Sequence, residues 1–264
     1  MEEAAASSRS SSSPPSWTGL LAAHTPSDPL FVHPMSVVKE GEAEMRLHLR
    51  SVDLSYHELK AVHSDPPVFS IAEFLTAAVC DRMIRNVVSG RGFAVGKSAT
   101  HGGSTVRSSS SWLLQNCECS ELLLAATMLT GVCRDNFEAV QILRYRTGES
   151  FGDHLDYLPT MASRGSQGNR IATLLVYLNS PGGGAQVGGG GGETRFRDLG
   201  LAVSPQMGSA LLFFPTFAAS GECDFRTIHS GVALGADMSD KWVAQVFVRQ
   251  GAFSAVERAA SFYM

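Results

Sequence analysis

The run Gln141-Ile142-Leu143-Arg144-Tyr145, followed at a short distance by His154-Leu155-Asp156, decides the fold and the kind of site expected of this chain. The first run is rich in apolar and aromatic residues and predicts a β-strand. If the second run is extended, its two-residue period directs the histidine and the aspartate to one face, where both can converge on one ion. Two histidines and one carboxylate can hold Fe(II) while leaving positions open for other molecules, so a second histidine is needed.

The same pattern also occurs earlier in the chain, at His63-Ser64-Asp65. With 8 histidines and 25 acidic residues present, roughly one match to His-x-acid is expected by chance. Pro66-Pro67 follows this first copy directly and favours a turn or an extended linker. Strand ends hold ligands more rigidly than linkers do, so we expect His154 and Asp156 to bind metal and the first copy not to.

The composition indicates a globular protein without a polyanionic partner. The chain has 264 residues and a formal net charge of −4, and no cluster of Lys and Arg suggests nucleic acid or an anionic membrane surface. No run approaches the roughly 18 consecutive apolar residues of a transmembrane helix. The N-terminus, Met1-Glu2-Glu3, lacks the features of a secretory signal, which favours a cytoplasmic or nuclear location. The 5 irregularly spaced cysteines are expected to be reduced thiols.

Composition divides the chain into four segments. Residues 1–30 are rich in Ser, Ala and Pro and predict a disordered tail, because they offer too little apolar surface to offset the entropy of ordering. Residues 31–66 are expected to be an extension that packs on the core, with one or two edge strands or a short helix. Residues 67–252 form the expected main domain, and residues 253–264 a C-terminal tail.

A strand and then a helix are expected at the start of the main domain. Val68-Phe69-Ser70-Ile71 is β-rich and predicts the strand. Thr76 could then cap a helix that ends at Gly90. The alternative starts this helix at Ser70, with Glu73 completing a capping box, but the β-rich run favours the first version.

A second helix is expected over roughly Ser120–Leu129, where apolar residues recur at helical spacing and Gly131 stands just beyond the end. After Ala139 the chain is expected to be all β. Short strands that follow helices predict an α+β domain whose sheet forms a sandwich or barrel, and the mouth of a barrel is a common place for a small-molecule site. The expected strands are Val140–Tyr145, Ile171–Leu178, Ala210–Phe214 and Trp242–Arg249.

Two segments rich in small residues, Gly96–Ser111 and Gly182–Gly192, are expected to be mobile loops. Either could be a lid that closes over a site. The alternative is a tolerated insertion at the surface, which is favoured for the second segment because it is mostly glycine.

The C-terminal half contains the remaining pieces of a possible site in order. A buried strand is expected at Ser209–Pro215, and Ile228-His229-Ser230-Gly231 and then Lys241 follow. A lone histidine is more often structural, but His229 on a neighbouring strand could complete the metal site. Lys241 could neutralise the far carboxylate of a bound dicarboxylate as a point charge.

In this order, the motifs resemble the prolyl 4-hydroxylase branch of the Fe(II)- and 2-oxoglutarate-dependent dioxygenases. The resemblance extends from about Val68 to Arg249 and implies a double-stranded β-helix (jelly-roll) core with N-terminal flanking helices. Nine ordered blocks carry it, and together they are more specific than any single motif. The blocks are Thr76–Ile84, Arg107–Ser109, Gln141–Tyr145 with Gly148, His154–Tyr157, Arg170–Leu178, Gly192–Phe196, Ser209–Phe214, Asp224–Gly231 and Lys241–Trp242.

The resemblance implies roles for particular residues. His154, Asp156 and His229 would bind the iron. Lys241 would pair with the C5 carboxylate of 2-oxoglutarate.

Four further residues have implied roles that the sequence leaves open. Tyr145 and Thr194 would hydrogen-bond the C5 carboxylate, Arg170 stands where the family contacts its peptide substrate, and Arg249 stands where relatives carry a histidine near that substrate. As alternatives, Tyr145 could be only a strand-end aromatic residue and Thr194 a routine turn or strand residue. Both arginines could face solvent, as long charged side chains usually do.

The chain departs from the family pattern mainly around the expected substrate. Besides Arg249, Phe247 replaces a tryptophan and Phe151 a common tyrosine. His229 and Lys241 are two residues further apart than in most relatives, and the glycine-rich loop is longer. The iron and co-substrate residues are all present, so the substrate is the least determined part of the implied function.

The implied activity couples oxidative decarboxylation of 2-oxoglutarate, with release of succinate and CO2, to hydroxylation of a prolyl residue in a protein or peptide. Fe(II), 2-oxoglutarate and O2 are the implied cofactor and co-substrates, and ascorbate the implied reductant. Two alternatives stay open: the same chemistry on another side chain or a small molecule, and a non-catalytic jelly-roll binder. The complete ligand set and the lysine disfavour the binder.

Overall fold

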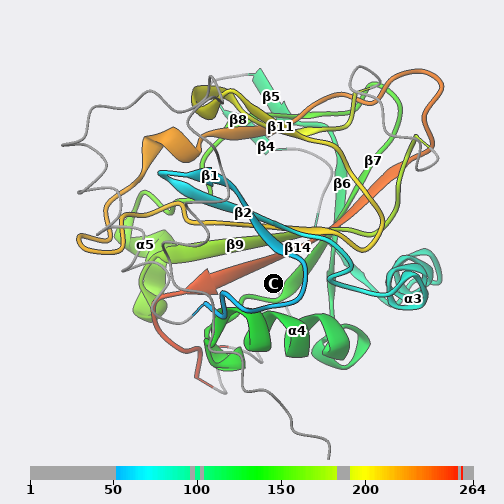
Figure 1. Cartoon of the computed structure of the whole chain (residues 1–264). Helices are drawn as coiled ribbons and strands as arrows, with labels where there is room; N and C mark the ends of the chain where they lie inside the picture. Colours follow the sequence, from blue (N-terminus) through cyan, green and yellow to red (C-terminus); the bar gives the residue numbers. More distant parts are fainter. Residues whose placement is uncertain (1–51, 96–98, 102–103, 183–190, 255–256, 258–264) are drawn as a thin grey trace, which may run out of the picture.

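The computed structural model describes residues 52–95, 99–101, 104–182, 191–254 and 257. Two antiparallel sheets lie face to face, and helices cover the outer side of the larger sheet (Figure 1). This arrangement confirms the predicted α+β fold with a jelly-roll core and flanking helices. The predicted tail 1–30, the extension before residue 52, most of Gly182–Gly192 and most of 253–264 lie outside the described residues.

Eight strands of the described chain, from two to nine residues long, form the larger sheet. They are β1 (Leu59–Ser64), β2 (Pro67–Ile71), β3 (Phe93–Ala94), β6 (Ser110–Leu114), β7 (Val140–Tyr145), β9 (Arg170–Tyr177), β12 (Ala210–Phe213) and β14 (Lys241–Arg249). Their order in the sheet is β1-β2-β12-β9-β14-β7-β6-β3. The four strands predicted after Ala139 are all present, each within one residue of its predicted ends. β14 lies between β9 and β7 with every residue buried, which explains its near-continuous apolar sequence.

The smaller sheet contains short strands that the sequence pattern does not predict. They are β4 (Ala99–His101), β5 (Ser104–Arg107), β8 (Phe151–His154), β10 (Thr194–Phe196), β11 (Leu201–Val203) and β13 (His229–Gly231), in the sheet order β11-β10-β13-β8-β5-β4. Strands of three or four residues are too short to show alternation. The loop predicted over Gly96–Ser111 is therefore wrong for its described residues, because β4, β5 and the start of β6 are paired strands, with β5 next to β8.

Two helices pack outside the larger sheet, α3 (Ala77–Val88) and α4 (Ser120–Thr130). Each begins where predicted and ends within two residues of the prediction. The Thr76 hydroxyl caps α3 by accepting a hydrogen bond from the Val79 backbone N–H at 3.4 Å. Gly131 ends α4 with a φ of 63°, a conformation that favours glycine. The alternative helix start at Ser70 is wrong, because this residue lies in β2.

A third helix, α5 (Met161–Arg164), lies between β8 and β9, so the prediction that the chain is all β after Ala139 is wrong there. Its single turn is too short to show helical periodicity. It forms because the side chains of Thr160 and Ser163 cap each other's backbone N–H groups, at 3.1 and 3.2 Å. Single 3-10 turns occupy Asn116–Glu118, Arg134–Asn136, Gly165–Gln167, Arg197–Leu199 and Phe225–Thr227.

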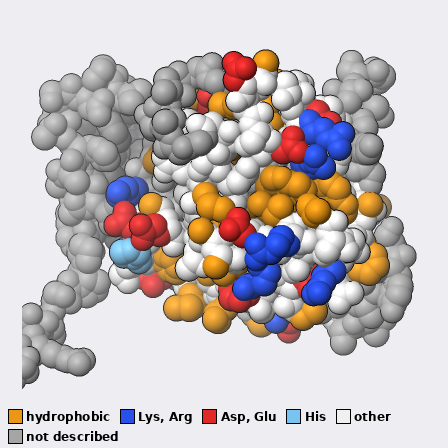
Figure 2. Space-filling model, turned by 90° about the vertical axis from the view of Figure 1, so that its right-hand side faces the viewer, with side chains coloured by type: hydrophobic (Ala, Val, Ile, Leu, Met, Phe, Trp, Pro, Cys, Tyr) orange, Lys and Arg blue, Asp and Glu red, His pale blue; other side chains and the backbone are white. Residues whose placement is uncertain are grey.

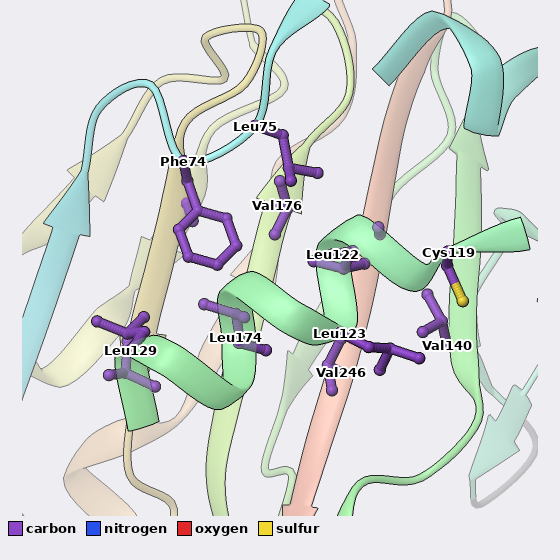
Figure 3. Packing of buried hydrophobic residues seen from close by; sticks show 14 of the residues in the cluster. Phe74, Leu75, Cys119, Leu122, Leu123, Leu129, Val140, Leu174, Val176 and Val246 are labelled. Carbon is purple, nitrogen blue, oxygen red and sulfur yellow. The ribbon is translucent and has the colours of Figure 1, made fainter. Parts of the chain in front are cut away.

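Apolar side chains form two clusters, one on each side of the larger sheet. The outer cluster joins the helices to the sheet, and Figure 3 shows α4 lying across strands β9 and β14 there. The inner cluster lies between the two sheets and ends at the site described below. Labelled members of the outer cluster are Phe74, Leu75, Cys119, Leu122, Leu123, Leu129, Val140, Leu174, Val176 and Val246. The two packed faces hold β9 and β14 rigidly, and both strands carry site residues.

The five cysteines carry free thiols, and Cys80 and Cys119 are buried in the outer cluster. Burial raises the pKa of the Cys119 thiol to about 12 and that of Cys80 to about 11, so both behave as small apolar residues at neutral pH. In the described part of the chain, no helix has the length and apolar character needed to cross a membrane.

Candidate metal and co-substrate site

His154 and His229 face each other across two strands of the smaller sheet. His154 ends β8 and pairs in register with His229, the first residue of β13, and the ring centroids are 4.3 Å apart. Nδ1 of His154 lies 2.9 Å from the Gly152 carbonyl oxygen, and Nδ1 of His229 lies 3.0 Å from that of Thr227. The tautomer that donates Nδ1–H to these carbonyls leaves the Nε2 lone pair of each ring free for a metal.

Asp156 follows β8 and turns its carboxylate toward both histidines. Its Oδ1 lies 3.7 Å from Nε2 of His154, and its Oδ2 lies 3.6 Å from Nε2 of His229. These distances suit groups that each bind one shared ion at about 2 Å. Thr173 of β9 donates a hydrogen bond to Oδ2 at 2.8 Å and so fixes the carboxylate. The three residues predicted as ligands thus lie together, with ligand atoms within 4.8 Å of one another.

The ionisation states of these groups suit metal binding. Burial, with the neighbouring His229, lowers the pKa of His154 to about 4, so this imidazole is neutral at physiological pH. Burial opposes the ionisation of Asp156, but His229 and His154 outweigh it and hold the pKa of the carboxyl below its usual value. A neutral imidazole and an ionised carboxylate are the forms that bind a metal.

Lys241 places a buried ammonium group in the same site. The residue is 2% exposed, and Nζ donates a hydrogen bond to the Gly192 carbonyl at 2.6 Å. Burial lowers its pKa to about 8, although the charge of Glu193 acts in the opposite direction. Among the described residues, no carboxylate forms an ion pair with Lys241. A buried charge without a counter-charge is costly, and a bound anion would complete the pair.

Tyr145 and Thr194 lie beside this ammonium group. Tyr145 is the register partner of Lys241 across β7 and β14, and its ring centroid is 4.8 Å from Nζ. Burial raises the pKa of Tyr145 to about 12, so the hydroxyl keeps its proton and can donate. Thr194 accepts a hydrogen bond from the Tyr177 hydroxyl at 2.8 Å, which leaves its own hydroxyl proton to donate.

Tyr177 and Thr173 are site residues that the sequence reasoning missed. Both lie in β9, whose sequence predicts only an apolar strand. Their signal was present, because a hydroxyl in a buried strand needs a hydrogen-bond partner inside the protein. Thr173 finds it in Asp156, and Tyr177 in Thr194.

A small cavity connects the metal-binding group to Lys241. It measures about 20 Å³, room for about one water, and its lining includes His154, His229, Thr194, Lys241 and Phe151. The Phe151 ring stacks on the His154 ring, with centroids 3.6 Å apart. A dicarboxylate can enter only if a lining side chain moves, and Phe151 and His154 are the partly exposed members of this set.

The two arginines predicted as substrate contacts share one carboxylate, that of Glu138. Arg170 donates to both of its oxygens at 2.8 Å, and Arg249 donates to Oε1 at 3.0 Å. The guanidinium of Arg170 also lies 3.4 Å from the Phe247 ring centroid and 3.4 Å from the carbonyl oxygen of Asp156. Glu138 is a further residue that the sequence reasoning missed.

Arg249 is 6% exposed and is held by backbone as well. It donates hydrogen bonds to the carbonyls of Gly168 and Arg164, which lie in the segment that carries α5. The alternative that Arg249 faces solvent is therefore wrong, and Arg170 is only partly exposed. Contact of either arginine with a substrate stays a prediction.

The chain matches the model of the 2OG-Fe(II) oxygenase superfamily over residues 140–249. This stretch contains the ligand group and Lys241. The chain is thus similar to the 2OG-Fe(II) oxygenase superfamily over the stretch that holds the candidate site.

The curated relatives that it matches include prolyl 4-hydroxylases. A putative prolyl 4-hydroxylase of Acanthamoeba polyphaga mimivirus is 30% identical over 125 residues, which cover 46% of this chain and 48% of the relative. The probable prolyl 4-hydroxylase 4 of Arabidopsis thaliana is 27% identical over 233 residues, covering 78% and 75%. The human prolyl 4-hydroxylase subunit alpha-1 is 30% identical over 149 residues, covering 54% and 26%. The match thus spans about half of the mimivirus relative and a quarter of the human one.

Two solved structures share the fold. The viral collagen prolyl hydroxylase of Paramecium bursaria Chlorella virus-1, in its 2OG complex, superposes with a TM-score of 0.53 at 24% identity, covering 69% of this chain and 95% of that one. A Trichoplax adhaerens prolyl hydroxylase, solved with a hypoxia inducible factor peptide fragment, gives 0.50 at 17% identity, covering 87% and 98%. At these identities the likeness concerns the fold alone.

Proposed function

We propose that this chain is an Fe(II)- and 2-oxoglutarate-dependent dioxygenase that hydroxylates a prolyl residue in a protein or peptide. Two complementary groups carry the proposal: a metal-binding group at His154, Asp156 and His229, whose histidines line the cavity, and the ammonium of Lys241 in the same cavity. Among the described residues, this ammonium has no ion-pair partner. 2-Oxoglutarate has a chelating end and a distal carboxylate, which match the two groups. The relatives named above support prolyl hydroxylation over other reactions of the superfamily.

In this proposal, His154, Asp156 and His229 hold Fe(II), and Thr173 keeps the carboxylate of Asp156 in position. Bound iron would supply the activation of O2 that couples decarboxylation of 2-oxoglutarate to hydroxylation of a substrate C–H bond. The Nδ1 hydrogen bonds of the two histidines hold both rings in the tautomer that can bind iron.

Lys241, Tyr145 and Thr194 would bind the C5 carboxylate of 2-oxoglutarate by one ion pair and two hydrogen bonds. The surrounding apolar residues of the inner cluster exclude water, which strengthens these interactions. Phe151 would cover the bound co-substrate from the side of His154.

The test is turnover of 2-oxoglutarate by the purified chain with Fe(II), ascorbate and proline-containing peptides. We expect succinate to form and a prolyl residue to gain one oxygen by mass spectrometry. His154→Ala should abolish both products, and His63→Ala, which alters the other His-x-Asp sequence, should keep both. Iron binding without consumption of 2-oxoglutarate with any peptide would contradict an enzymatic role, and oxygen on another residue type would favour the alternative substrates.

Ascorbate as the reductant and a cytoplasmic or nuclear location are also part of the proposal. The first is tested by omitting ascorbate, which should shorten the period of linear turnover. The second is tested by fractionating cells that carry the tagged chain.

A further inference from the structure

Four arginines lie around the metal-binding group and are called here the arginine rim: Arg107, Arg164, Arg170 and Arg249. On the face seen in Figure 2, basic and acidic side chains lie next to one another, as expected of paired surface charges in a chain of net charge −4. The rim differs, because its positive charges outnumber the carboxylates that bind them.

Arg170 and Arg249 together have one carboxylate between them. Both donate to Glu138, at 2.8 and 3.0 Å, so this group of three carries a net charge of about +1 at neutral pH. Arg249 also donates hydrogen bonds to the Gly168 and Arg164 carbonyls. Arg170 donates one hydrogen bond to the Asp156 carbonyl.

Arg164 and Arg107 bind neutral groups. Arg164 donates to the Leu158 carbonyl at 2.8 Å and to the Tyr157 hydroxyl at 2.5 Å. Arg107 donates to the Ser111 hydroxyl at 3.3 Å, and its buried Nε has no hydrogen-bond partner among the described residues. Within the same part of the chain, neither guanidinium has a carboxylate partner.

Besides the metal-binding carboxylate of Asp156, the carboxylate of Glu257 lies near this region, but it does not neutralise the rim. It accepts hydrogen bonds from Ser166 at 2.7 Å and from Gln167 at 2.6 Å. Even with Glu257 and Asp156 included, four arginines face three carboxylates.

The rim surrounds the metal-binding group from two directions. Arg107 lies 5.7 Å from the ring centroid of Phe151, which stacks on His154. On the other side, Arg170 donates a hydrogen bond to the carbonyl of Asp156. The guanidinium carbon of Arg164 lies 5.1 Å from the ring centroid of Tyr157, the residue after Asp156. A polypeptide that approaches the metal-binding group would therefore pass between these charges.

Building on the proposed function, we propose that the polypeptide substrate is acidic, with Asp or Glu side chains flanking the residue that is hydroxylated. Partly buried guanidinium groups without counter-charges are unfavourable, and a carboxylate can accept two parallel hydrogen bonds from each. Arg107 and Arg164 are the two rim members with donors and charge left for such a partner. The co-substrate does not remove the excess, because its distal carboxylate is matched by Lys241.

The test compares three synthetic peptides of equal length, each with one central proline flanked by Glu, Gln or Lys at the same positions. Binding is measured to the Mn(II)-loaded chain with 2-oxoglutarate, and turnover with Fe(II). We expect the Glu peptide to bind about tenfold more tightly than the Gln peptide, and the Lys peptide most weakly. The difference should shrink as salt is added, because exposed charges are screened.

Arg164→Gln should remove most of the preference for the Glu peptide. Arg85→Gln, which removes an exposed arginine from α3, is the matched control and should keep it. Thermal melting of both variants checks that they are folded. Equal binding of the Glu and Gln peptides, or a full preference in folded Arg164→Gln, would overturn the inference.

The outcomes also separate this inference from the proposed function. Preferential binding of the Glu peptide without any hydroxylated product would support an acidic ligand and contradict prolyl hydroxylation. Equal binding and equal hydroxylation of the Glu and Gln peptides would support prolyl hydroxylation and contradict an acidic substrate.

Discussion

The sequence His-x-Asp occurs at residues 63–65 and at residues 154–156, and the two copies have different surroundings. His63 lies near the end of β1, where its Nδ1 is 2.8 Å from the Pro66 carbonyl oxygen, and Asp65 accepts a hydrogen bond from Arg226 at 3.0 Å. His154 instead faces His229 from a neighbouring strand, with Asp156 between their Nε2 atoms. A local pattern of two residues becomes a metal-binding group only where a third ligand lies across the sheet.

The largest expected difference between the copies is in the two aspartates. Asp156→Asn should lower turnover by about a thousandfold or more, because a neutral amide is a poor ligand for a hard divalent cation. Asp65→Asn should leave turnover unchanged and cost less than about 1 kcal/mol of unfolding free energy, since the ion pair it loses is partly exposed. Succinate formation and chemical denaturation measure the two effects. Equal loss of activity in both variants would contradict the claim that only the second copy binds the metal.

Lys241→Met tests the group that makes the second copy a co-substrate site. We expect the dissociation constant for 2-oxoglutarate to rise by about a hundredfold, because the distal carboxylate would be buried without a counter-charge. Without co-substrate the variant should gain about 1–3 kcal/mol of unfolding free energy, since a buried unpaired charge is removed. Calorimetry of co-substrate binding and thermal melting measure both. A variant that loses stability and keeps its affinity would contradict an anion site at Lys241.

Thr173→Val removes the hydrogen bond that orients Asp156. Among the described residues, no threonine donates such a bond to Asp65. The metal affinity should fall by about tenfold, the lower end of the usual effect of groups that support metal ligands. Thr173→Ser keeps the hydroxyl and should restore most of the affinity. Competition with a chelator measures the affinity, and an unchanged value in Thr173→Val would show that Asp156 is held by other contacts.

The smallest effect expected is on the pH dependence of co-substrate binding. Burial lowers the pKa of Lys241 to about 8, so the free protein loses this positive charge as the pH rises through that value. The dianionic co-substrate needs the charged form, so binding should weaken with rising pH, by about threefold between pH 7.5 and 8.5. Titrations at several pH values measure this, and Lys241→Met should show no such dependence. Tighter binding at higher pH would contradict the role given to Lys241.

The sequence predicted the central strands of the larger sheet and the two outer helices well, because their signals are local, but it missed β3 and β6 at one edge. β7, β9, β12 and β14 are long apolar runs, and Thr76 and Gly131 are capping residues with direct physical reasons to stand where they do. The smaller sheet was largely missed. Its strands are three or four residues long and include the small residues of Gly96–Ser111, so their pairing is decided by neighbours far away in the chain.

The site was predictable as a set of residue types, and its supporting groups were not. His154, Asp156, His229 and Lys241 stand out by their order and spacing, helped by a resemblance that covers most of the chain. Thr173, Tyr177 and Glu138 act through partners 17, 17 and 32 residues away, so no local pattern reveals them. These residues fix the orientation of the ones that were predicted.

By itself, the sequence determined which residues can bind a metal and a dicarboxylate, because this ability depends on side-chain chemistry. The tertiary structure decided which of the two His-x-Asp copies has a facing histidine, and that Lys241 is buried with no ion-pair partner among the described residues. It also decided that Arg249 is bound to Glu138 and to backbone carbonyls rather than to solvent. Strand pairing between distant segments sets these distances, and burial sets the charge states, so neither can be read from neighbouring residues in the chain.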